Sequence, residues 1–339
     1  MSTDAQTAAP PNDFAILRKM IVEKGLLERN LGFFVWKIVL NTTMLAIGIA
    51  VLFLTKNLFL LLLDAVYLAF VYGQIGLLGH DAGHRQIFSS TFKNDLVGHP
   101  CGLALGISMH AWMDKHNEHH VHPNREDMDP DIEFPIIAFS ERQARDKKGL
   151  AGFCVRQQGW LFPWLLPFVA GSLRYSAFHS VFTRPIKKVW VDAVLLFTHF
   201  VAYFTLLFLL LPPLHAVLFI LVHQGCFGFY MALIFAPNHK GMVMLGKDEK
   251  MDFLREQVLT ARNVRGGVLA DFWYGGLNYQ VEHHLFPTMP RNKLRKANSI
   301  VRQFCKDKGI PYHETGVIES YVEIMGHMGR IAKYARTLA

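Results

Sequence analysis

Four long apolar runs constrain this chain more than any other feature. A helix that crosses a membrane needs about 20 mainly apolar residues. Four runs meet that length, and they extend from Phe33 to Leu54, Leu58 to Leu78, Trp190 to Leu211 and Leu214 to Ala236. Hydrophobic residues make up 51% of the chain, which is typical of a multi-spanning membrane protein. We therefore expect an all-α integral membrane protein.

Short connections divide the four runs into two pairs. Residues 55–57 join the first pair, and Pro212 and Pro213 join the second pair, so the sequence predicts four transmembrane helices in two hairpins. The hairpin tips carry only Lys56, whereas several lysines and arginines flank the other ends of the runs. Because basic residues gather on the cytoplasmic side of a membrane, we expect both termini and the long middle loop in the cytoplasm.

A fifth apolar run, from Gly159 to Leu173, is too short for a clear span and holds Pro163 and Pro167. One extra crossing here would separate the histidines that precede this run from those that follow it. If those histidines form one site, the run must lie in the membrane interface or re-enter.

The ends of the chain differ from the middle. Residues 1–30 are expected to be a cytoplasmic tail, of which Met1 to Asp13 are rich in Ala, Thr and Pro, lack an apolar core and are expected to be disordered, without a cleavable signal peptide. Residues 31–290 form the predicted membrane domain, and residues 291–339 a basic cytoplasmic region. The net charge of +8 fits basic loops beside a membrane, and without a separate basic domain it indicates no nucleic-acid partner.

Histidine is crowded into a few short stretches, although the chain contains 17 of them. His80 and His84 lie four residues apart directly after the second run, so they share one helix face. His116, His119 and His120 follow at positions i, i+3 and i+4, so a single helical turn presents three imidazoles. Imidazole is a common ligand of first-row metals, and the clusters indicate a metal site.

A third cluster repeats the same spacing. Gln280, His283 and His284 occupy positions i, i+3 and i+4, with glutamine in the first place. Four cysteines are scattered without a Cys-x-x-Cys pair, so the metal ligands are predicted to be histidines and not thiolates. Three clusters of this kind are hard to explain as surface histidines.

The three stretches HDAGH, HNEHH and QVEHHLFP resemble the three histidine boxes of the membrane fatty acid desaturases, and the glutamine resembles the front-end (delta-6-like) branch. Further support comes from Pro123-Asn124 and Asp129-Pro130-Asp131 after the second box and from Gly275-Gly276 before the third. The resemblance covers roughly Phe33 to Pro290.

Carried over position by position, the resemblance implies a diiron centre, with O2 as a cosubstrate. The implied ligands are the histidines of the three boxes and one more histidine after the fourth run, namely His80, His84, His116, His119, His120, His239, His283 and His284. Gln280 stands where other branches have histidine, and whether its amide oxygen binds iron or orients a water stays open, as does a role for Asn238 beside His239.

Acidic residues beside the boxes have two interpretations. Asp81, Glu118 and Glu282 either accept a ring N–H from a ligand histidine and fix its tautomer, or solvate a helix. The three acids after the second box, Asp127, Asp129 and Asp131, either cap a helix or bind a headgroup.

The other histidines are given simpler roles. Those within or at the ends of the runs are expected to bond helix carbonyls, and these are His199, His215 and His223. Those near the boxes are candidates for supporting the ligands, and these are His99, His110 and His122.

The resemblance implies an enzyme that uses O2 and two electrons to put a double bond into an acyl chain, carried either by a lipid or by CoA. The similarity to bacterial front-end desaturases implies the bacterial cytoplasmic membrane. The chain shows no His-Pro-Gly-Gly haem signature, Cys-rich iron–sulfur run or Gly-x-Gly-x-x-Gly fingerprint, so we expect an external electron donor of the ferredoxin or cytochrome type, with a reductase.

Two alternatives use the same residues differently. A membrane diiron hydroxylase or ketolase would have the same boxes, because box spacing reports the metal site and not the product. A histidine-rich metal transporter fits less well, since its ligands should lie along a transmembrane path. The basic stretch from Arg291 to Lys308 is expected either to contact anionic lipid headgroups or to dock an acidic electron donor.

Overall fold

The structure is a computed structural model that describes residues 12–183 and 189–338. The helices and loops of the described chain are accompanied by one small parallel sheet, in which β1 (Asn263–Val264) pairs with β2 (Glu314–Thr315). Most of the predicted disordered segment, residues 1–11, lies outside the described residues.

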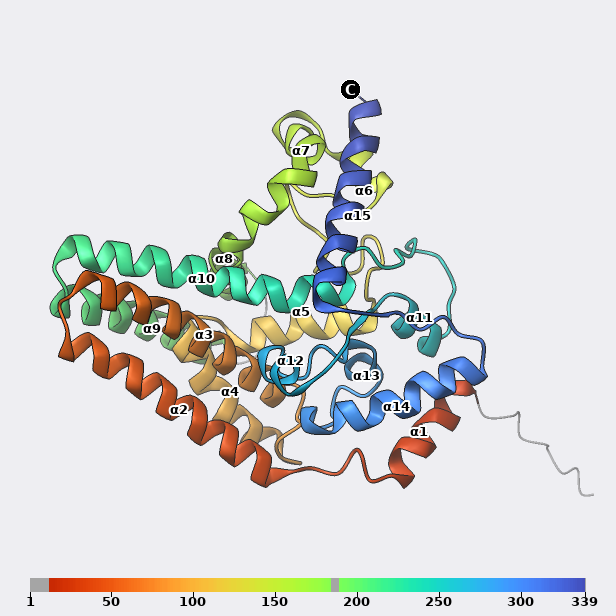
Figure 1. The fold of residues 1–339 in the computed structure, drawn as a ribbon, viewed down its shortest axis with the longest axis horizontal. Coiled ribbons are helices and arrows are strands. Elements are labelled where there is room, and N and C mark those ends of the chain that lie inside the picture. Colours follow the sequence, from red (N-terminus) through yellow and green to blue (C-terminus); the bar gives the residue numbers. More distant parts are fainter. Residues whose placement is uncertain (1–11, 184–188, 339) are drawn as a thin grey trace, which may run out of the picture.

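Four helices are long and apolar enough to cross a membrane, and they are α2 (Leu31–Leu54), α3 (Leu58–Gly83), α9 (Val189–Leu210) and α10 (Pro213–His239). This confirms the prediction of four candidate spans in a mainly helical protein. The loops that join α2 to α3 and α9 to α10 lie at the same end of the molecule (Figure 1). Both α3 and α10 continue beyond the apolar runs, so that His80 and His239 belong to these helices.

Local sequence explains where these helices begin. The Asn30 side chain accepts a hydrogen bond from the Phe33 N–H, and the Asn57 side chain accepts one from the Leu60 N–H, which are N-caps of α2 and α3. Pro212 and Pro213 precede and open α10, where a missing N–H costs no helical hydrogen bond.

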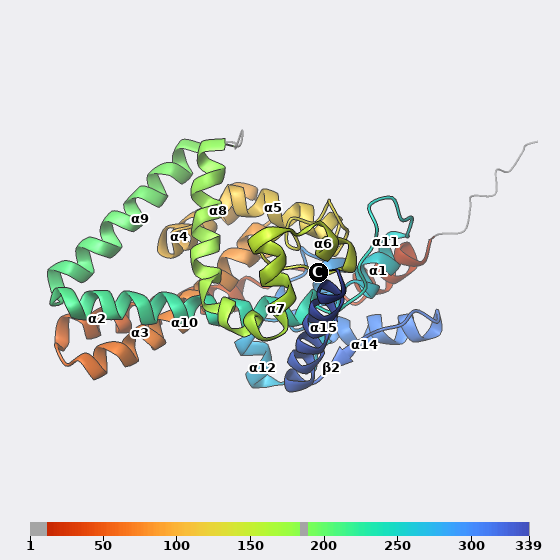
Figure 2. The same ribbon diagram turned by 90° about the horizontal axis from the view of Figure 1, so that it is seen from above.

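The helices α3 and α10 form the centre of the membrane part and pack against each other. Their backbones approach closely because Gly73 has no side chain: a Cβ there would lie 2.1 Å from the Tyr230 ring. The outer helices α2 and α9 expose large apolar side chains such as Trp36 and Phe197, as expected where lipid is the solvent. Figure 2 shows α9 running away from α10 toward α8.

The remaining helices lie beside α3 and α10 or at their other end, and we call them the cap (Figure 1). They are α1 (Asp13–Glu23), α4 (Thr91–Leu105), α5 (Met109–Val121), α6 (Glu141–Asp146), α7 (Gly149–Leu165), η1 (Leu166–Phe168), α8 (Val169–Thr183), α11 (Phe253–Leu259), α12 (Val268–Trp273), α13 (Gln280–Leu285), α14 (Arg291–Asp307) and α15 (Val317–Thr337).

The fifth apolar run forms no straight helix. It comprises the end of α7, the 3₁₀ turn η1 and the start of α8, and it is not among the four candidate spans of the described chain. The turn packs on α10, where Gly228 leaves room for it: a Cβ at Gly228 would lie 2.1 Å from the Pro167 carbonyl oxygen.

The N-terminal region corrects one expectation. We expected residues 1–30 to be a tail, but residues 13–23 form α1, whose Leu17 and Ile21 are fully buried in a cluster with residues of α11, α13 and α14. Leu17 and Ile21 are four residues apart and share one helix face, so burial of that face fixes α1 on the cap. The predicted C-terminal region likewise joins the cap, since α14 contacts α1 and α13, and α15 contacts α7.

Candidate metal centre

The first two histidine clusters lie on adjoining helix ends. His80 is in the last turn of α3 and His84 follows as its C-cap residue. The next cluster lies on α5, which begins where the Ser108 hydroxyl accepts a hydrogen bond from the Ala111 N–H at 3.1 Å. This start places His116 and His120 beside His84, with ring centroids 4.9 and 4.6 Å from the His84 ring.

The third cluster reaches the same place through a glycine turn. Gly275 and Gly276 have φ of 60° and 85°, a region that favours glycine, and a Cβ at Gly275 would lie 2.6 Å from a Leu77 methyl group. The short helix α13 then follows, and its Val281 N–H donates to the Asn263 side chain at 2.9 Å. The turn and this bond aim His283 and His284 at the ends of α3, α5 and α10.

The structure brings all eight predicted histidines together, and two groups can be distinguished. Each group has one ligand atom per residue, and these atoms lie within 4.8 Å of one another. The α3 group comprises His80, His84, His116 and His283, and the α10 group comprises His119, His239 and His284. His120 lies between them: its Nε2 is 3.1 Å from His116 Nε2, and its ring stacks on His284 with centroids 4.2 Å apart.

Ring nitrogens face one another inside both groups. The Nε2 atoms of His84 and His116 are 2.9 Å apart, and His239 Nε2 lies 3.1 Å from His284 Nε2. The buried His80 Nε2 and both ring nitrogens of His283 have no hydrogen-bond partner among the described residues. Buried polar atoms are rarely left in this state, and nitrogens that converge without partners fit metal binding.

Burial also sets the charge state of these rings. It lowers the pKa of His84, His116, His283 and His284 well below the usual value for histidine and the pKa of His120 to about 3. These rings are therefore neutral at pH 7, with a lone pair available to a metal. Burial also opposes protonation of His119, but the Asp129 carboxylate outweighs it and raises the pKa of His119.

Three partners orient the rings of the α10 group, and the sequence did not assign them this role. The Asp129 carboxylate faces His119 Nδ1 at 3.0 Å, the Gln257 side-chain oxygen faces His284 Nδ1 at 2.8 Å, and the Thr260 carbonyl faces His239 Nδ1 at 3.0 Å. In each case Nδ1 is engaged and Nε2 points into the group. Partners of this kind fix the tautomer of a metal-binding histidine.

Gln280 lies at the α10 group, and Asn238 precedes His239 of that group in the chain. Gln280 Nε2 is 3.0 Å from His239 Nε2, and the buried Gln280 Oε1 accepts no hydrogen bond from the described residues. The Asn238 Oδ1 atom is likewise buried without a described donor, while its backbone carbonyl accepts from the Arg262 N–H at 2.8 Å. Gln280 is therefore placed to act on a metal or on a bound water.

Of the two interpretations left open for Asp81, Glu118 and Glu282, support of a ligand ring is not seen among the described residues, since none of these acids bonds to a histidine ring. Asp81 pairs with Arg291 at 3.0 Å. Glu282 accepts hydrogen bonds from Tyr312 and Asn263, both at 2.7 Å. Glu118 is exposed, and no described histidine ring bonds to it. Helix geometry explains the outcome, because neighbours of a ligand point away from the face that holds it.

The remaining histidines take up other contacts. His199 Nδ1 faces the Leu103 carbonyl at 2.8 Å, which confirms the carbonyl role expected for it. His110 was a candidate for supporting a ligand, and its Nδ1 pairs with Asp192 at 2.8 Å. Its ring lies near that of His99, with centroids 4.9 Å apart, so these residues form a cluster separate from both histidine groups.

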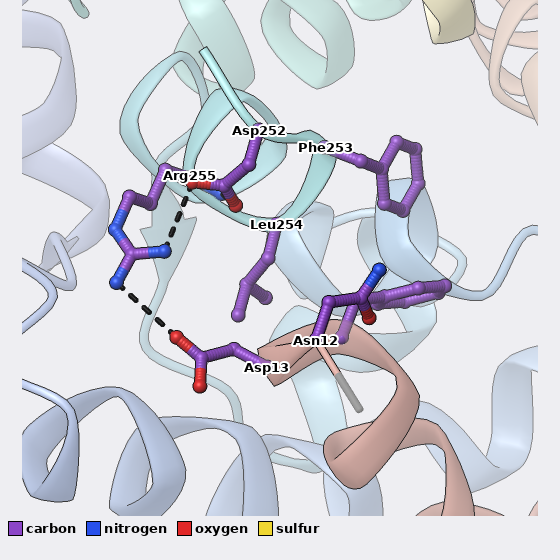
Figure 3. A pocket seen from close by; sticks show the side chains of 7 residues that line it. Asn12, Asp13, Asp252, Phe253, Leu254 and Arg255 are labelled. Carbon is purple, nitrogen blue, oxygen red and sulfur yellow. Dashed lines mark hydrogen bonds and ion pairs between the residues drawn. The ribbon is translucent and has the colours of Figure 1, made fainter. Parts of the chain in front are cut away.

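Two cavities adjoin the α3 group, and a third lies elsewhere. A small apolar cavity of about 30 Å³ is lined by His80, and a polar one of about 390 Å³ is lined by His84. The third, of about 560 Å³, lies between α1 and α11, where Arg255 bridges Asp13 and Asp252 (Figure 3). Its described lining holds no histidine, so this third cavity is not part of the metal centre.

Four candidate spans with eight histidines gathered at one end, six of them buried and two half-buried, are the arrangement expected of a membrane metalloprotein that binds its metal at the end of the spans. Sequence comparison identifies the family. The chain matches the fatty acid desaturase family over residues 56–316 and belongs to that family. The membership favours a desaturase over the hydroxylase or ketolase alternative.

Three relatives illustrate the similarity. The chain is 30% identical over 334 residues to the acyl-lipid (9-3)-desaturase of Physcomitrium patens, covering 95% of this chain and 63% of the relative. It is 30% identical over 338 residues to the delta(8)-fatty-acid desaturase of Euglena gracilis, covering 95% and 79%. It is 29% identical over 353 residues to the delta(6)-fatty-acid desaturase fat-3 of Caenorhabditis elegans, covering 99% and 78%. The chain thus spans less than two thirds of the length of the first of these relatives.

Proposed function

We propose that this protein is a membrane fatty acyl desaturase that introduces a double bond into an acyl chain with O2 and two electrons, at two iron ions held by the eight histidines. One observation carries the proposal: two groups of mostly buried imidazoles lie side by side at the ends of the candidate spans α3 and α10, and one of their rings, His80, also lines an apolar cavity.

The protein's contribution is to hold and shield the metal. Two irons bound here would supply the O2-derived oxidant that removal of hydrogen from an unactivated methylene requires, since no side chain supplies one. The α3 group, the α10 group and His120 provide the ligands, and the cap excludes bulk water, because seven of the nine candidate side chains including Gln280 are buried. The lining of the apolar cavity binds the chain beside His80.

The orientation follows from the distribution of charge. Basic residues flank the histidine end of the spans, which supports the inference that the termini and the cap lie in the cytoplasm and that α2–α3 and α9–α10 are two hairpins. We infer that the fifth apolar run, which bends at η1, re-enters the membrane or lies in its interface, because either course would keep all histidines on one side. Location in a bacterial cytoplasmic membrane stays a prediction.

The electrons are proposed to come from a separate donor of the ferredoxin or cytochrome type, kept reduced by a reductase. The exposed face of α14 carries Lys296, Arg302 and Lys306. Their positive charge would attract an acidic electron donor. This helix begins shortly after α13, which supplies one ring to each histidine group.

Product analysis tests the proposal. Expression in a host followed by analysis of fatty acid methyl esters should show a new double bond for the wild-type chain and none for His119→Ala. Hydroxy or keto products would indicate the alternative chemistry, and a change in metal content without any new lipid would contradict an oxygen-dependent enzyme.

His179→Ala is the matched control for these variants. His179 is exposed and contacts Thr183 in its own helix, so its loss should leave both the protein level and the product unchanged. His199 is less suitable as a control, because it is buried and bonds to α4.

A further inference from the structure

Three helices bring a further set of metal-binding side chains together outside the two histidine groups. His99 lies on α4, His110 is the second residue of α5, and Asp192 is in the first turn of α9. One ligand atom from each residue lies within 4.8 Å of the other two. These residues belong to neither the α3 group nor the α10 group, so a metal ion bound here would be separate from the proposed diiron centre.

The chemistry of the three side chains selects the kind of ion. Two imidazoles with one carboxylate suit a transition metal such as Zn²⁺, whereas Mg²⁺ and Ca²⁺ prefer oxygen ligands alone. Zinc often has three protein ligands and completes its tetrahedron with a water molecule. Both imidazoles line the polar cavity of about 390 Å³, which leaves room for that water. The cluster therefore fits Zn²⁺.

The side chains already lie close to the spacing that an ion requires. Two atoms bound to one zinc ion lie within about 4 Å of each other, because each is about 2.0–2.1 Å from the metal. The His110 Nδ1 and Asp192 Oδ2 atoms are 2.8 Å apart, and the His99 and His110 ring centroids are 4.9 Å apart. Small side-chain rotations would bring all three ligand atoms onto one ion without moving the helices.

Burial of Asp192 favours a cation in the cluster. The Asp192 side chain is 1% exposed, and among the described residues it pairs with His110 and with no lysine or arginine. A carboxylate removed from water is costly unless its charge is compensated. A doubly charged ion would compensate that carboxylate and would also bind the second imidazole.

A simple ion pair is the competing explanation. A protonated His110 beside Asp192 would satisfy the carboxylate, but it does not explain why a second imidazole lies against the first from another helix. A proton on His99 as well would place two like charges side by side. A single divalent ion accounts for both imidazoles and the carboxylate together.

We propose that His99, His110 and Asp192 bind one Zn²⁺ ion, which ties the start of the span α9 to α4 and α5 of the cap. The three helices contact one another. The His199 ring of α9, which lies 2.8 Å from the Leu103 carbonyl of α4, marks the same contact farther along the span. The ion has a structural role, and this proposal does not depend on the proposed desaturation.

Metal analysis of the iron-loaded protein tests the site. The purified protein in detergent is equilibrated with Zn²⁺, and zinc and iron are both measured per chain. The wild-type protein should bind about one zinc ion without losing iron, and excess Mg²⁺ should not displace the zinc. His99→Gln, His110→Gln and Asp192→Asn should each weaken zinc binding at least about 10-fold, and an unchanged iron content shows that the fold is intact.

Two matched controls make the same changes elsewhere. His179→Gln replaces an exposed histidine, and Asp64→Asn replaces a buried carboxylate of the span α3. Both should bind zinc as the wild-type protein does. If the histidine groups held no iron, zinc would fill them too, but the loss of one zinc ion in His110→Gln would still identify this site.

Two results would overturn the proposal: a wild-type protein that binds zinc only by displacing iron, or variants of all three residues that keep the wild-type zinc affinity. Either result would leave the cluster as the His110–Asp192 ion pair.

Hydrogen exchange tests the tie between α9 and the cap. Zinc should slow amide exchange in the first turns of α5 and α9, because opening of these turns would then require release of the ion. The same protection should appear in His179→Gln and be absent in His110→Gln. Exchange that zinc leaves unchanged in the wild-type protein would refute the structural role.

Discussion

The α3 group and the α10 group are built from the same side chain, yet the protein surrounds them differently. Each ring of the α10 group has its outer nitrogen bonded to a fixed acceptor: Asp129 for His119, Gln257 for His284 and the Thr260 carbonyl for His239. No carboxylate, amide or carbonyl of the described residues bonds to a ring of the α3 group.

Packing orients the α3 group instead. Trp112 stacks on His116 with centroids 4.6 Å apart and an interplanar angle of 17°, and the His80 and His283 rings lie 4.7 Å apart. Hydrogen bonds fix both the tautomer and the direction of a ring, whereas packing fixes only the direction. We therefore expect the α10 group to be the more rigid metal site and the α3 group, which faces the apolar cavity, to be the more adaptable one.

The largest effect should follow removal of a ligand from either group. His119→Ala and His80→Ala should each lower product formation by at least about 100-fold, because an iron site that loses a ligand loses geometry and metal together. Iron content per chain measures the difference between the groups. His80→Ala should retain the iron of the α10 group, and equal iron loss in both variants would contradict an independent α10 site.

Loss of an outer partner should come next. Asp129→Asn should weaken iron binding about 10- to 100-fold, since it removes the charge that raises the pKa of His119. Part of the local shape is retained, because the remaining amide oxygen can still accept a hydrogen bond from one of the two backbone N–H groups, those of Asn124 and Asp131, that the Asp129 carboxylate accepts from. Iron retention against a chelator provides the measurement, with the exposed Asp127→Asn as control.

The sequence predicted the parts of this site that depend on local spacing. Apolar runs of sufficient length indicated the four spans, and the i, i+3, i+4 spacing indicated which histidines share a face. The outer partners escaped prediction because they arrive through tertiary packing: Gln257 and Thr260 come from α11 and its end, far from the boxes in sequence. Asp129 was noticed, but only as a helix cap or a headgroup ligand, and its role as a partner of the His119 ring was missed.

The tail at the N-terminus was mispredicted for a related reason. Leu17 and Ile21 have the i, i+4 spacing of an apolar helix face, but two residues are too few to predict a helix. This helix is stabilised by packing on the apolar faces of α11 and α14, which the sequence did not reveal. A short helix in a protein is stabilised mainly by packing of its apolar face, so two apolar residues predict a helix only when the surface that buries them is known.

Gln280 tests whether the α10 group uses an amide as well as imidazoles. Gln280→Ala should lower turnover about 10-fold if the buried Oε1 binds iron or orients a water, and Gln280→His should retain part of the activity. Turnover and iron content are measured together. Unchanged turnover in the alanine variant would show that the amide only fills space beside His239. The exposed Gln303→Ala serves as the control.

A smaller effect is expected where packing alone orients a ring. Trp112→Phe keeps an aromatic surface but reduces its stacking on His116, so iron affinity of the α3 group should fall only about 2- to 5-fold. The exposed Trp160→Phe is the control. If Trp112→Phe lowered iron affinity as much as Asp129→Asn does, the two groups would not differ in how strongly their surroundings support iron binding.

The smallest effect concerns delivery of electrons. The structure shows which basic residues of α14 can be changed to test donor docking without breaking contacts inside the protein. Arg295 bonds to Asp271 and to Tyr279 at 2.6 and 3.0 Å, and Lys308 pairs with Asp13 at 2.7 Å, so changing either residue also disturbs the cap. Lys296 and Lys306 are exposed on the same face of α14 and form no ion pair among the described residues.

Reversing both charges, Lys296→Glu with Lys306→Glu, should raise the donor concentration needed for half-maximal turnover in detergent about 2- to 5-fold, and added salt should shrink the difference between variant and wild type. The pair Lys148→Glu with Lys333→Glu, exposed on other parts of the cap, should change nothing. Because α13 carries one ring of each group, a donor on α14 would reach both by a similar route. Unchanged donor dependence in detergent, together with lower activity in membranes, would assign this face to anionic lipid headgroups.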